Sequence, residues 1–544
     1  MGGNSINNSK ITEEKEAAKN PPINSIPMSP GFAEMLNRHS FGLDEQRPEA
    51  VARRHQKNQR TARENIEDLL DTDSFIEYGA LTIAAQRRRR PLDDLMRNTP
   101  ADGLITGIGS INGSLFGDEK ARCMVLAYDY TVIAGTQGYF NHKKIDRMLK
   151  LAHEQHLPVV LFAEGGGGRP GEVDIKGIVS SALDLSTFSK FAALSGKAPL
   201  VGIVSGYCFA GNAALLGCCD VIIATRNSNI GMGGPVMIEG GGLGKFRPEE
   251  IGPTDVQMRN GVVDIAVVDE AEAVAVAKQY LSYLQGPTLE WQAADQKILR
   301  KMIPFNRRRV YDVRAIIRTI ADNESFLELR PAFGPGMITA FIRIEGHPFG
   351  VIANHCKHLG GAIDSDGADK AARFMQLCNA YGIPILSLCD TPGFMVGPEI
   401  EAKAQVRHVS RMFVVGSHIN VPYFTVVLRR GYGLGAMAMA KGGFHESFFT
   451  TAWPTGEFGA MGIEGSVKSG FKKELEDTET DEEYHVLFNK LVDKMYDIGK
   501  AVNVASLMEI DAVIDPADTR KWIMQGLKSV PRKKEDSHSF IDTW

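Results

Sequence analysis

The sequence lacks the features that mark membrane, secreted and nucleic-acid-binding proteins. No uninterrupted apolar run in its 544 residues reaches the roughly 18 residues that a membrane-spanning helix needs. The first ten residues contain no apolar core of the kind found in a secretory signal peptide. The formal net charge is −5, so there is no excess of positive charge for nucleic acid. We therefore expect no membrane or nucleic-acid partner and a cytoplasmic location.

Paired cysteines are also missing. The chain has seven cysteines, and none forms the C-x-x-C pair that is typical of zinc sites. Most lie in apolar or small-residue runs, where buried, reduced thiols are the usual finding. His355 and His358 are three positions apart but have no acidic third ligand nearby, so we interpret them as a structural pair. The sequence predicts no metal in this chain.

One pattern of helix and strand occurs twice along the chain. In each half an amphipathic helix is followed by a proline, a buried strand and a glycine-containing loop. Pro384 follows Pro158 by 226 positions (384 − 158), and Gly431 follows Gly206 by 225 (431 − 206). These matching offsets indicate a duplicated α/β domain with much parallel strand pairing. We expect domains at 46–290 and 291–515, a flexible arm at 1–45 and a surface tail at 516–544.

Each half also has a strand-to-helix turn built from small residues. The turns contain Ala210 and Gly211 in the first half, and Leu434 and Gly435 in the second. Small residues allow a carbonyl oxygen to approach backbone N–H groups that could stabilise a developing negative charge. The alternative is that glycine here only permits tight packing of a helix on a strand. Because two turns occur at matched offsets, we favour an oxyanion-binding role for both.

At these residues the chain resembles a known superfamily. The stretch "GYCFAGNAALLGCCDVIIATRNSNIGM" (206–232) is similar to the oxyanion-hole segment of the crotonases. The resemblance places the oxygen-binding N–H on Gly211. The two catalytic glutamates of enoyl-CoA hydratases fall on Ala214 and approximately Gly234, so hydration is not expected. The implied fold is two tandem crotonase-like domains, each a β-β-α superhelix.

The second half resembles one branch of that superfamily, the carboxyltransferase (beta) subunits of biotin-dependent acyl-CoA carboxylases. The stretches that carry this likeness are "AARFMQLCNAYGIPILSLCDTPGF" (371–394), "RRGYGLGAMAMA" (429–440) and "TAWPTGEFGAMGIEGSV" (451–467). "TARENIEDLLDTDSFIE" (61–77) and "RPEEIGPTDVQMRNGVVDIAVVDEAEA" (247–273) match further family patterns. Two loops depart from the family: "EGGGGRPGEVD" (164–174) replaces an S-G-G-A-R loop, and "YGLGA" (432–436) replaces Y-G-G-A.

The resemblance implies which residues bind the reactants. The first-half turn is expected to bind the acyl-CoA thioester, and the second-half turn the ureido oxygen of carboxybiotin. Met437 stands where the family position is linked to acyl chain length, and Asp390 is interpreted as a buried capping residue rather than a catalytic one. The expected binding residues are Gly166, Gly167, Gly168, Asp390, Pro392, Gly393, Phe394, Tyr432, Gly433, Ala436 and Met437, beside the four catalytic turn residues.

The resemblance also implies partners. Biotin is expected on a carrier protein, because the carrier motif A-M-K-M is absent here, and a biotin carboxylase is expected on a separate or fused chain. Family members place the two oxyanion holes across a dimer interface, commonly in a hexamer that is a trimer of dimers. A decarboxylase or transcarboxylase component, or a scaffold subunit without activity, remains an alternative to the carboxylase subunit.

Two other motifs suggest competing functions. "GGGRPG" (166–171) satisfies G-x-G-x-x-G, but Pro170 lies where a dinucleotide-binding loop should open a helix. The runs Arg87–Arg90 and Arg307–Arg309 are typical of solvated faces, and the first of them is a candidate for holding the CoA phosphates.

Overall fold

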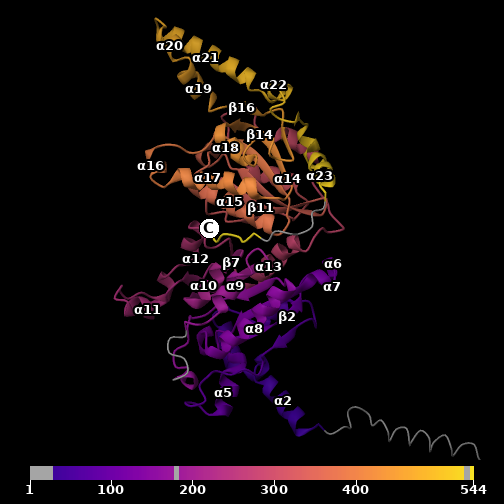
Figure 1. Cartoon of the computed structure of the whole chain (residues 1–544), viewed down its shortest axis with the longest axis vertical. Coiled ribbons are helices and arrows are strands. Elements are labelled where there is room, and N and C mark those ends of the chain that lie inside the picture. The colour runs from indigo at the N-terminus through magenta and orange to yellow at the C-terminus, as the bar shows by residue number, and fades with distance from the viewer. Residues whose placement is uncertain (1–27, 177–182, 532–538) are drawn as a thin grey trace, which may run out of the picture.

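Two large β-sheets, one in each half of the chain, form the frame of this computed structural model (Figure 1). The structure describes residues 28–176, 183–531 and 539–544. The first sheet has the strand order β1-β2-β3-β4-β5-β7-β9, and the second has β10-β11-β12-β13-β14-β15-β17 with β16 beside β14. In both sheets the first three strands pair antiparallel and the later strands pair parallel. The two halves therefore share one topology, which confirms the predicted duplicated α/β fold.

The strand bounds follow the buried apolar runs of the sequence. The first sheet comprises β1 (Ile76–Tyr78), β2 (Leu104–Ser110), β3 (Arg122–Tyr128), β4 (Val159–Phe162), β5 (Leu200–Val204), β7 (Val221–Thr225) and β9 (Ile265–Val267). The second comprises β10 (Leu327–Leu329), β11 (Met337–Ile344), β12 (His347–Asn354), β13 (Ile385–Thr391), β14 (Tyr423–Tyr432), β15 (Phe449–Ala452), β16 (Glu457–Gly459) and β17 (Ala512–Val513).

Buried lysines repeat at the same place in the two halves. Helix α8 (Tyr139–Gln155) carries Lys144, whose Nζ donates to the backbone carbonyl of Leu104. Helix α15 (Ser365–Ala380) carries Lys370, whose Nζ donates to the carbonyl of Arg330 at 2.7 Å. The donor Lys370 follows the donor Lys144 by 226 positions (370 − 144), and the acceptor Arg330 follows the acceptor Leu104 by the same number (330 − 104). Burial lowers the pKa of Lys144 to about 8 and that of Lys370 to about 7. The duplication therefore extends to individual buried hydrogen bonds.

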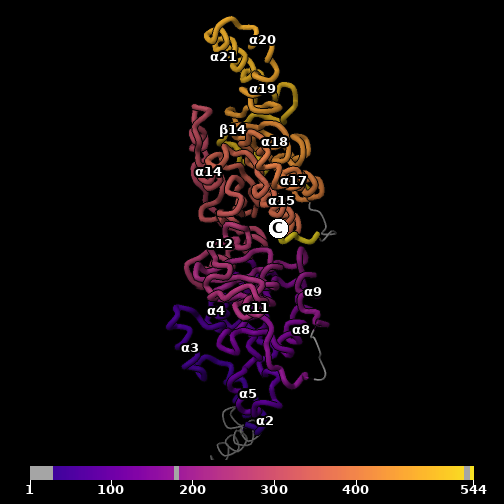
Figure 2. The backbone as a smooth tube through the Cα atoms, turned by 90° about the vertical axis from the view of Figure 1, so that its left-hand side faces the viewer, coloured from indigo at the N-terminus to yellow at the C-terminus, as the bar shows by residue number. Residues whose placement is uncertain are grey.

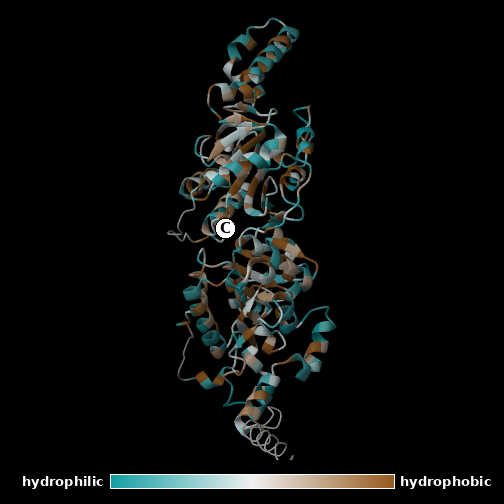
Figure 3. Ribbon diagram, turned by 90° about the vertical axis from the view of Figure 1, so that its right-hand side faces the viewer, coloured by the Kyte–Doolittle hydropathy of each residue, from teal (hydrophilic) through white to brown (hydrophobic). Residues whose placement is uncertain are grey.

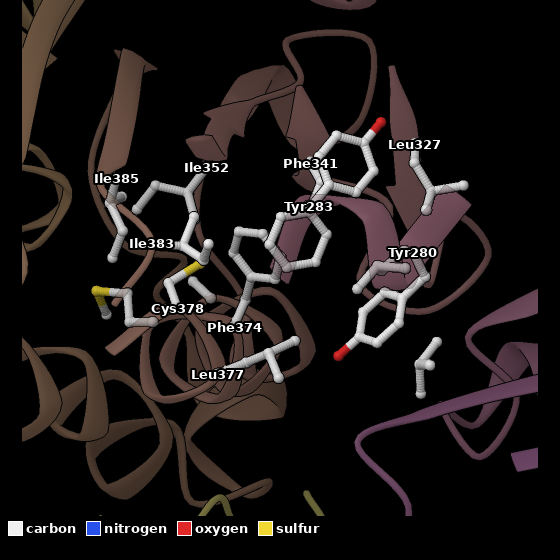
Figure 4. Close-up of a cluster of buried hydrophobic side chains, with 14 of the residues drawn as sticks. Tyr280, Tyr283, Leu327, Phe341, Ile352, Phe374, Leu377, Cys378, Ile383 and Ile385 are labelled. Atoms are coloured by element: carbon white, nitrogen blue, oxygen red, sulfur yellow. The ribbon is translucent and has the colours of Figure 1, made fainter. Parts of the chain in front are cut away.

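One hydrophobic core joins the two halves. Helix α13 (Glu270–Leu284) closes the first half, and its Tyr280 and Tyr283 pack against Phe341 of β11, with ring centroids 5.8 Å and 5.4 Å apart (Figure 4). The same cluster of buried side chains includes Val125 of the first sheet and Phe374 of α15. Because these side chains interdigitate across the boundary, the halves are held in one arrangement.

Two features lie outside the duplicated pattern. The segment expected as an arm contains helix α2 (Pro30–Ser40), while residues 1–27 lie outside the described part of the chain. A helical projection, α19 (Ile463–Gly470), α20 (Lys472–Glu476) and α21 (Asp481–Ile498), extends from the end of the second half (Figure 2). Its helices alternate hydrophilic and hydrophobic residues along their length (Figure 3). No helix of the described residues is long and apolar enough to cross a membrane.

Residues 539–544 connect the two halves, although the sequence suggests a surface tail there. Ile541 belongs to the shared core and is 6% exposed. Its backbone N–H donates to Ser195 Oγ of the first half at 3.0 Å. The neighbouring Asp542 carboxylate pairs with Arg411 of helix α17 (Gln405–His418) in the second half at 2.8 Å. This short segment therefore acts as a strap across the boundary.

We expect Ile541→Ala to weaken the contact between the halves, because it removes buried apolar surface from the strap. The loss is about 2 kcal/mol, at the low end for a buried isoleucine. Phe540→Ala is the matched control, since Phe540 is 69% exposed, and its effect should stay within about 0.5 kcal/mol. Thermal unfolding at one scan rate and one protein concentration measures both. Equal unfolding temperatures for the two variants would contradict the strap.

Candidate active site

The first turn joins strand β6 (Tyr207–Phe209) to helix α10 (Gly211–Gly217). Ala210, between them, has φ 51° and ψ −120°, a backbone conformation that residues with a side chain adopt only at a cost of about 1–3 kcal/mol. Gly167 lies directly against it: a Cβ atom on Gly167 would be 2.6 Å from the Cβ of Ala210 and 3.6 Å from the N of Gly211. The strained residue and the glycine loop predicted from the sequence therefore meet.

Backbone hydrogen bonds hold the glycine loop on this turn. The N–H of Gly165 donates to the carbonyl of Tyr207 at 2.8 Å, and the N–H of Phe209 donates to the carbonyl of Gly165 at 2.9 Å. The N–H of Gly167 donates to Oδ1 of the fully buried Asn212 at 3.0 Å. Asn212 thus ties the loop to the start of α10. Gly166 and Gly168 stay exposed on either side of Gly167.

The second turn repeats this contact in the other half. Strand β14 ends at Tyr432, and helix α18 (Gly433–Met439) follows. A Cβ atom on Gly435 would lie 2.8 Å from the Cα of Gly393, which has φ +123°. Gly393 follows Gly167 by 226 positions (393 − 167), and Gly435 follows Ala210 by 225 (435 − 210). The two close contacts therefore occupy similar places in the two halves.

The other predicted residues of the second half surround this contact. Pro392 and Phe394 flank Gly393, and the Phe394 ring packs on helix α17. Leu434 and Met437 point outward from α18, with 61% and 38% of their surface exposed. The Tyr432 hydroxyl, in contrast, donates to Glu457 Oε2 at 3.0 Å and is directed into the protein. These predicted binding residues of the second half, polar and apolar alike, thus lie around the second turn.

Asp390 is the buried ionic anchor of the second turn. Its carboxylate is fully buried and pairs with Arg429 at 2.8 Å and Arg430 at 2.7 Å. Tyr311 donates its hydroxyl to the same carboxylate at 2.8 Å. Burial alone would raise the pKa of Asp390, but the two guanidinium groups hold it below its ordinary value. Asp390 is therefore a charged clamp between strands β13 and β14, in keeping with a structural role.

Glu164 occupies the same position in the first half, and sequence reasoning did not single it out. It precedes Asp390 by 226 positions (390 − 164), and this offset was the available signal. Arg54 of helix α3 (Pro48–His55) pairs with it at 2.8 Å. Burial raises the pKa of Glu164 to about 7 despite this cation, with Glu270 adding to the rise. Each glycine loop thus begins with a buried carboxylate that is bound to arginine.

The first arginine run contacts the end of the first glycine loop, and the second contacts the residue that binds Tyr432. The backbone N–H groups of Arg87 and Arg88 donate to the carboxylate of Asp174, at the end of the first glycine loop, at 2.7 and 2.8 Å. Arg307 pairs with Glu457, the partner of Tyr432, at 3.1 Å.

Within the described residues, no group of three or more His, Cys, Asp and Glu side chains could hold a metal ion. The glycine loop of the G-x-G-x-x-G match is followed by a short 3₁₀ turn at Val173–Ile175 rather than by a long helix.

Comparison with known proteins identifies the family. Residues 53–540 match the family model described as the carboxyl transferase domain. The methylmalonyl-CoA carboxyltransferase 12S subunit of Propionibacterium freudenreichii subsp. shermanii is 30% identical over 495 residues, which cover 89% of this chain and 91% of that protein. The propionyl-CoA carboxylase beta chain of Saccharopolyspora erythraea is 29% identical, with 93% of each chain covered.

Solved structures agree with these sequence relatives. A single-chain, multi-domain long-chain acyl-CoA carboxylase matches with a TM-score of 0.87 and 55% identity over 92% of this chain. This chain spans about half the length of that carboxylase, 49%. The transcarboxylase 12S structure matches with a TM-score of 0.78 and 28% identity over 94% of this chain and 99% of that one. The chain therefore belongs to the carboxyl transferase domain family and is a carboxyltransferase of the kind found in biotin-dependent acyl-CoA carboxylases.

Proposed function

We propose that the first turn binds the thioester oxygen of an acyl-CoA and that the second turn binds the ureido oxygen of a carboxylated biotin. The observation that carries this proposal is the repeated close contact of a glycine loop with a strand-to-helix turn, Gly167 on Ala210 and Gly393 on Gly435. A Cβ atom on Gly167 or on Gly435 would collide with the facing segment, so each turn is built on closely packed backbone whose N–H groups could bind a ligand oxygen. This cradle of small residues fits a planar carbonyl or ureido group.

The turns act by positioning and by complementing charge. When bound on its carrier, biotin supplies the carboxyl group that is transferred. In the first turn, the N–H of Gly211 would face the thioester oxygen and stabilise negative charge that builds up there as the α-carbon loses its proton. In the second turn, Leu434 and Gly435 would orient the ureido oxygen, while Asp390 keeps the strands around the turn in register. The protein groups thus bind, orient and stabilise charge.

We propose that a second copy of the chain completes the site. The first turn lies in the lower half of the molecule, at α10, and the second in the upper half, at α18 (Figure 1). Apolar side chains are exposed beside both: Leu434 and Met437 on α18, and Val236 and Met237 on α11 (Pro235–Gly240), which are 84% and 62% exposed. Such patches mark contact surfaces. The 12S relative assembles as a hexamer, which supports the same assembly here.

We propose that the substrate is an acyl-CoA with a long acyl chain, and that biotin reaches the site on a partner protein or domain together with a biotin carboxylase. The support for the acyl chain is the 55% identity to the long-chain acyl-CoA carboxylase, against 28% to the transcarboxylase 12S structure, over nearly the same share of this chain. The exposed apolar side chain of Met437 at the second turn is compatible with this assignment.

The N–H of Gly211 is tested by a matched pair of substitutions. A Cβ atom at Gly211 would lie 2.1 Å from Gln137 Oε1, so any side chain there displaces Gln137. Gly211→Ala carries this clash and keeps the N–H, whereas Gly211→Pro carries it and removes the N–H. We expect kcat for carboxyl transfer to be about 10²–10³-fold lower in the proline variant than in the alanine variant. Equal rates in the two variants would exclude Gly211 as an oxyanion donor.

The acyl-chain preference is tested with a panel of acyl-CoA thioesters from acetyl to palmitoyl. With a carboxylated carrier present, ¹⁴C fixation reports kcat/KM for each thioester. We expect kcat/KM to increase with chain length, because each further methylene that becomes buried contributes about 0.8 kcal/mol. A maximum at acetyl-CoA or propionyl-CoA would contradict the long-chain assignment and leave the carboxyltransferase assignment intact.

A further inference from the structure

The Glu164 side chain lies at the joint between the two segments that form the first turn. Glu164 is the last residue before the glycine loop, so its backbone leads directly into Gly165. Its carboxylate packs against Gly206, where a Cβ atom would be 2.4 Å from Glu164 Oε1. Gly206 has φ +96° and forms the bend from β5 into β6, which leads to Ala210. A displacement of this carboxylate would therefore move both sides of the turn.

Arg54 holds this carboxylate with a planar, two-pronged contact. Its Nη1 donates to Glu164 Oε1 at 2.9 Å, and its Nη2 lies 2.8 Å from Oε2. Both side chains are 10% exposed. The Nε of Arg54 donates to the carbonyl of Arg60 at 2.9 Å, which fixes the guanidinium plane from the other side. A lysine could not reproduce this geometry, because its ammonium is a point charge.

The two halves supply the cation from different places. In the second half, Arg429 and Arg430 belong to β14, the strand that runs into the turn. The equivalent positions of the first half, by the 225-residue offset, are Val204 and Ser205 (429 − 225 and 430 − 225), and neither is charged. The first half instead receives its cation from Arg54 of α3, 110 positions before Glu164 in the chain.

We propose that Arg54 is a positioning residue for acyl-CoA. Through Glu164 it holds the glycine loop 165–168 against Ala210 and Gly211, so that the N–H of Gly211 meets the thioester oxygen. Helix α3 thereby becomes part of the acyl-side site although it does not touch the substrate. The substrate in this statement rests on the proposed function, whereas the effect of Arg54 on the loop does not.

The charges around Glu164 give the contact a pH dependence. Arg54 favours the ionised form of Glu164, while Glu270, Asp129 and the burial of the group favour the protonated form, and its pKa is about 7. The hydroxyl of Tyr130 and the thiol of Cys208 also face the carboxylate and are neutral at this pH. Glu164 therefore gains a proton as the pH falls through 7, and the ion pair becomes a weaker neutral-to-cation hydrogen bond.

Three variants of the full-length protein test the proposal. Arg54→Met removes the cation, and Arg54→Lys keeps the charge without the two-pronged contact. Arg63→Met is the matched control, because it removes an arginine from the ion pair with Glu77 in the same N-terminal region and has no contact with the loop. We expect kcat/KM for acyl-CoA to fall about 10²-fold in Arg54→Met, to fall less in Arg54→Lys, and to stay within twofold of the parent in Arg63→Met. The KM for the carboxylated carrier should be unchanged in all three.

Hydrogen exchange of the peptide that covers residues 160–172, measured by mass spectrometry without any ligand, reports the loop itself. We expect faster exchange of the Gly165 and Gly167 amides in Arg54→Met and parent-like exchange in Arg63→Met. The parent should lose kcat/KM for acyl-CoA as the pH falls from 8 to 6, and Glu164→Gln, which cannot ionise, should be slow and independent of pH over that range.

The outcomes test the positioning role of Arg54 separately from the proposed function. Parent-like kinetics and exchange in Arg54→Met would overturn the positioning role. If Arg54→Met fails to fold, Arg54→Lys and Glu164→Gln carry the test, and a parent-like pH profile in Glu164→Gln would overturn it. Faster loop exchange in Arg54→Met, with no carboxyl transfer by the parent on any acyl-CoA, would support the positioning of the loop and reject the proposed function.

Discussion

Close backbone contact between a glycine loop and a strand-to-helix turn is the constraint on which this structure depends. The contacts of Gly167 with Ala210 and of Gly393 with Gly435 leave no room for a Cβ atom on Gly167 or on Gly435. Ala210, beside the first contact, has a positive φ of 51°, a strain that the surrounding hydrogen bonds must offset. The buried carboxylates beside the turns and the core shared by the two halves keep these contacts in place.

A buried carboxylate at the start of each glycine loop is the main group that keeps the loop in contact with its turn. Glu164 lies two residues after β4, Asp390 is the penultimate residue of β13, and each is bound by arginine in a buried site. The environments differ in strength: two cations hold the pKa of Asp390 low, whereas a single close cation leaves the pKa of Glu164 near 7. At this shared position, Asp390 therefore stays ionised in the second half, whereas the charge of Glu164 in the first half changes with pH near 7.

The frame around the turns is rigid because the halves are packed together rather than linked end to end. Tyr280 of the first half meets Phe341 of the second edge-on, Tyr283 stacks on it, and Ile541 adds a further contact from the other end of the chain. Such a core has few alternative packings. The two turns of one chain consequently stay in separate halves, which supports the proposal that a second copy brings complementary turns together.

Much of the fold could be predicted from the sequence. Pro158 and Pro384, with Gly206 and Gly431, revealed the duplication, and the apolar runs between them marked the parallel strands. The turn residues and both glycine loops were also recognised, since a small-residue turn after a buried strand is a local pattern. The roles of these residues in binding stay predictions. Arg54, Glu164 and the strap at 539–544 were not recognised, because each depends on a partner far away in the chain.

The sequence by itself determined the fold class, the twofold repetition and the positions of the two turns, because periodicity, chain breaks and small residues act over a few neighbouring positions. Only the tertiary structure decided which loop lies on which turn and that α3 delivers the cation of the first half. These pairings arise from packing between segments far apart in the chain, such as Arg54 with Glu164, 110 positions away. Local pattern carries no information about them.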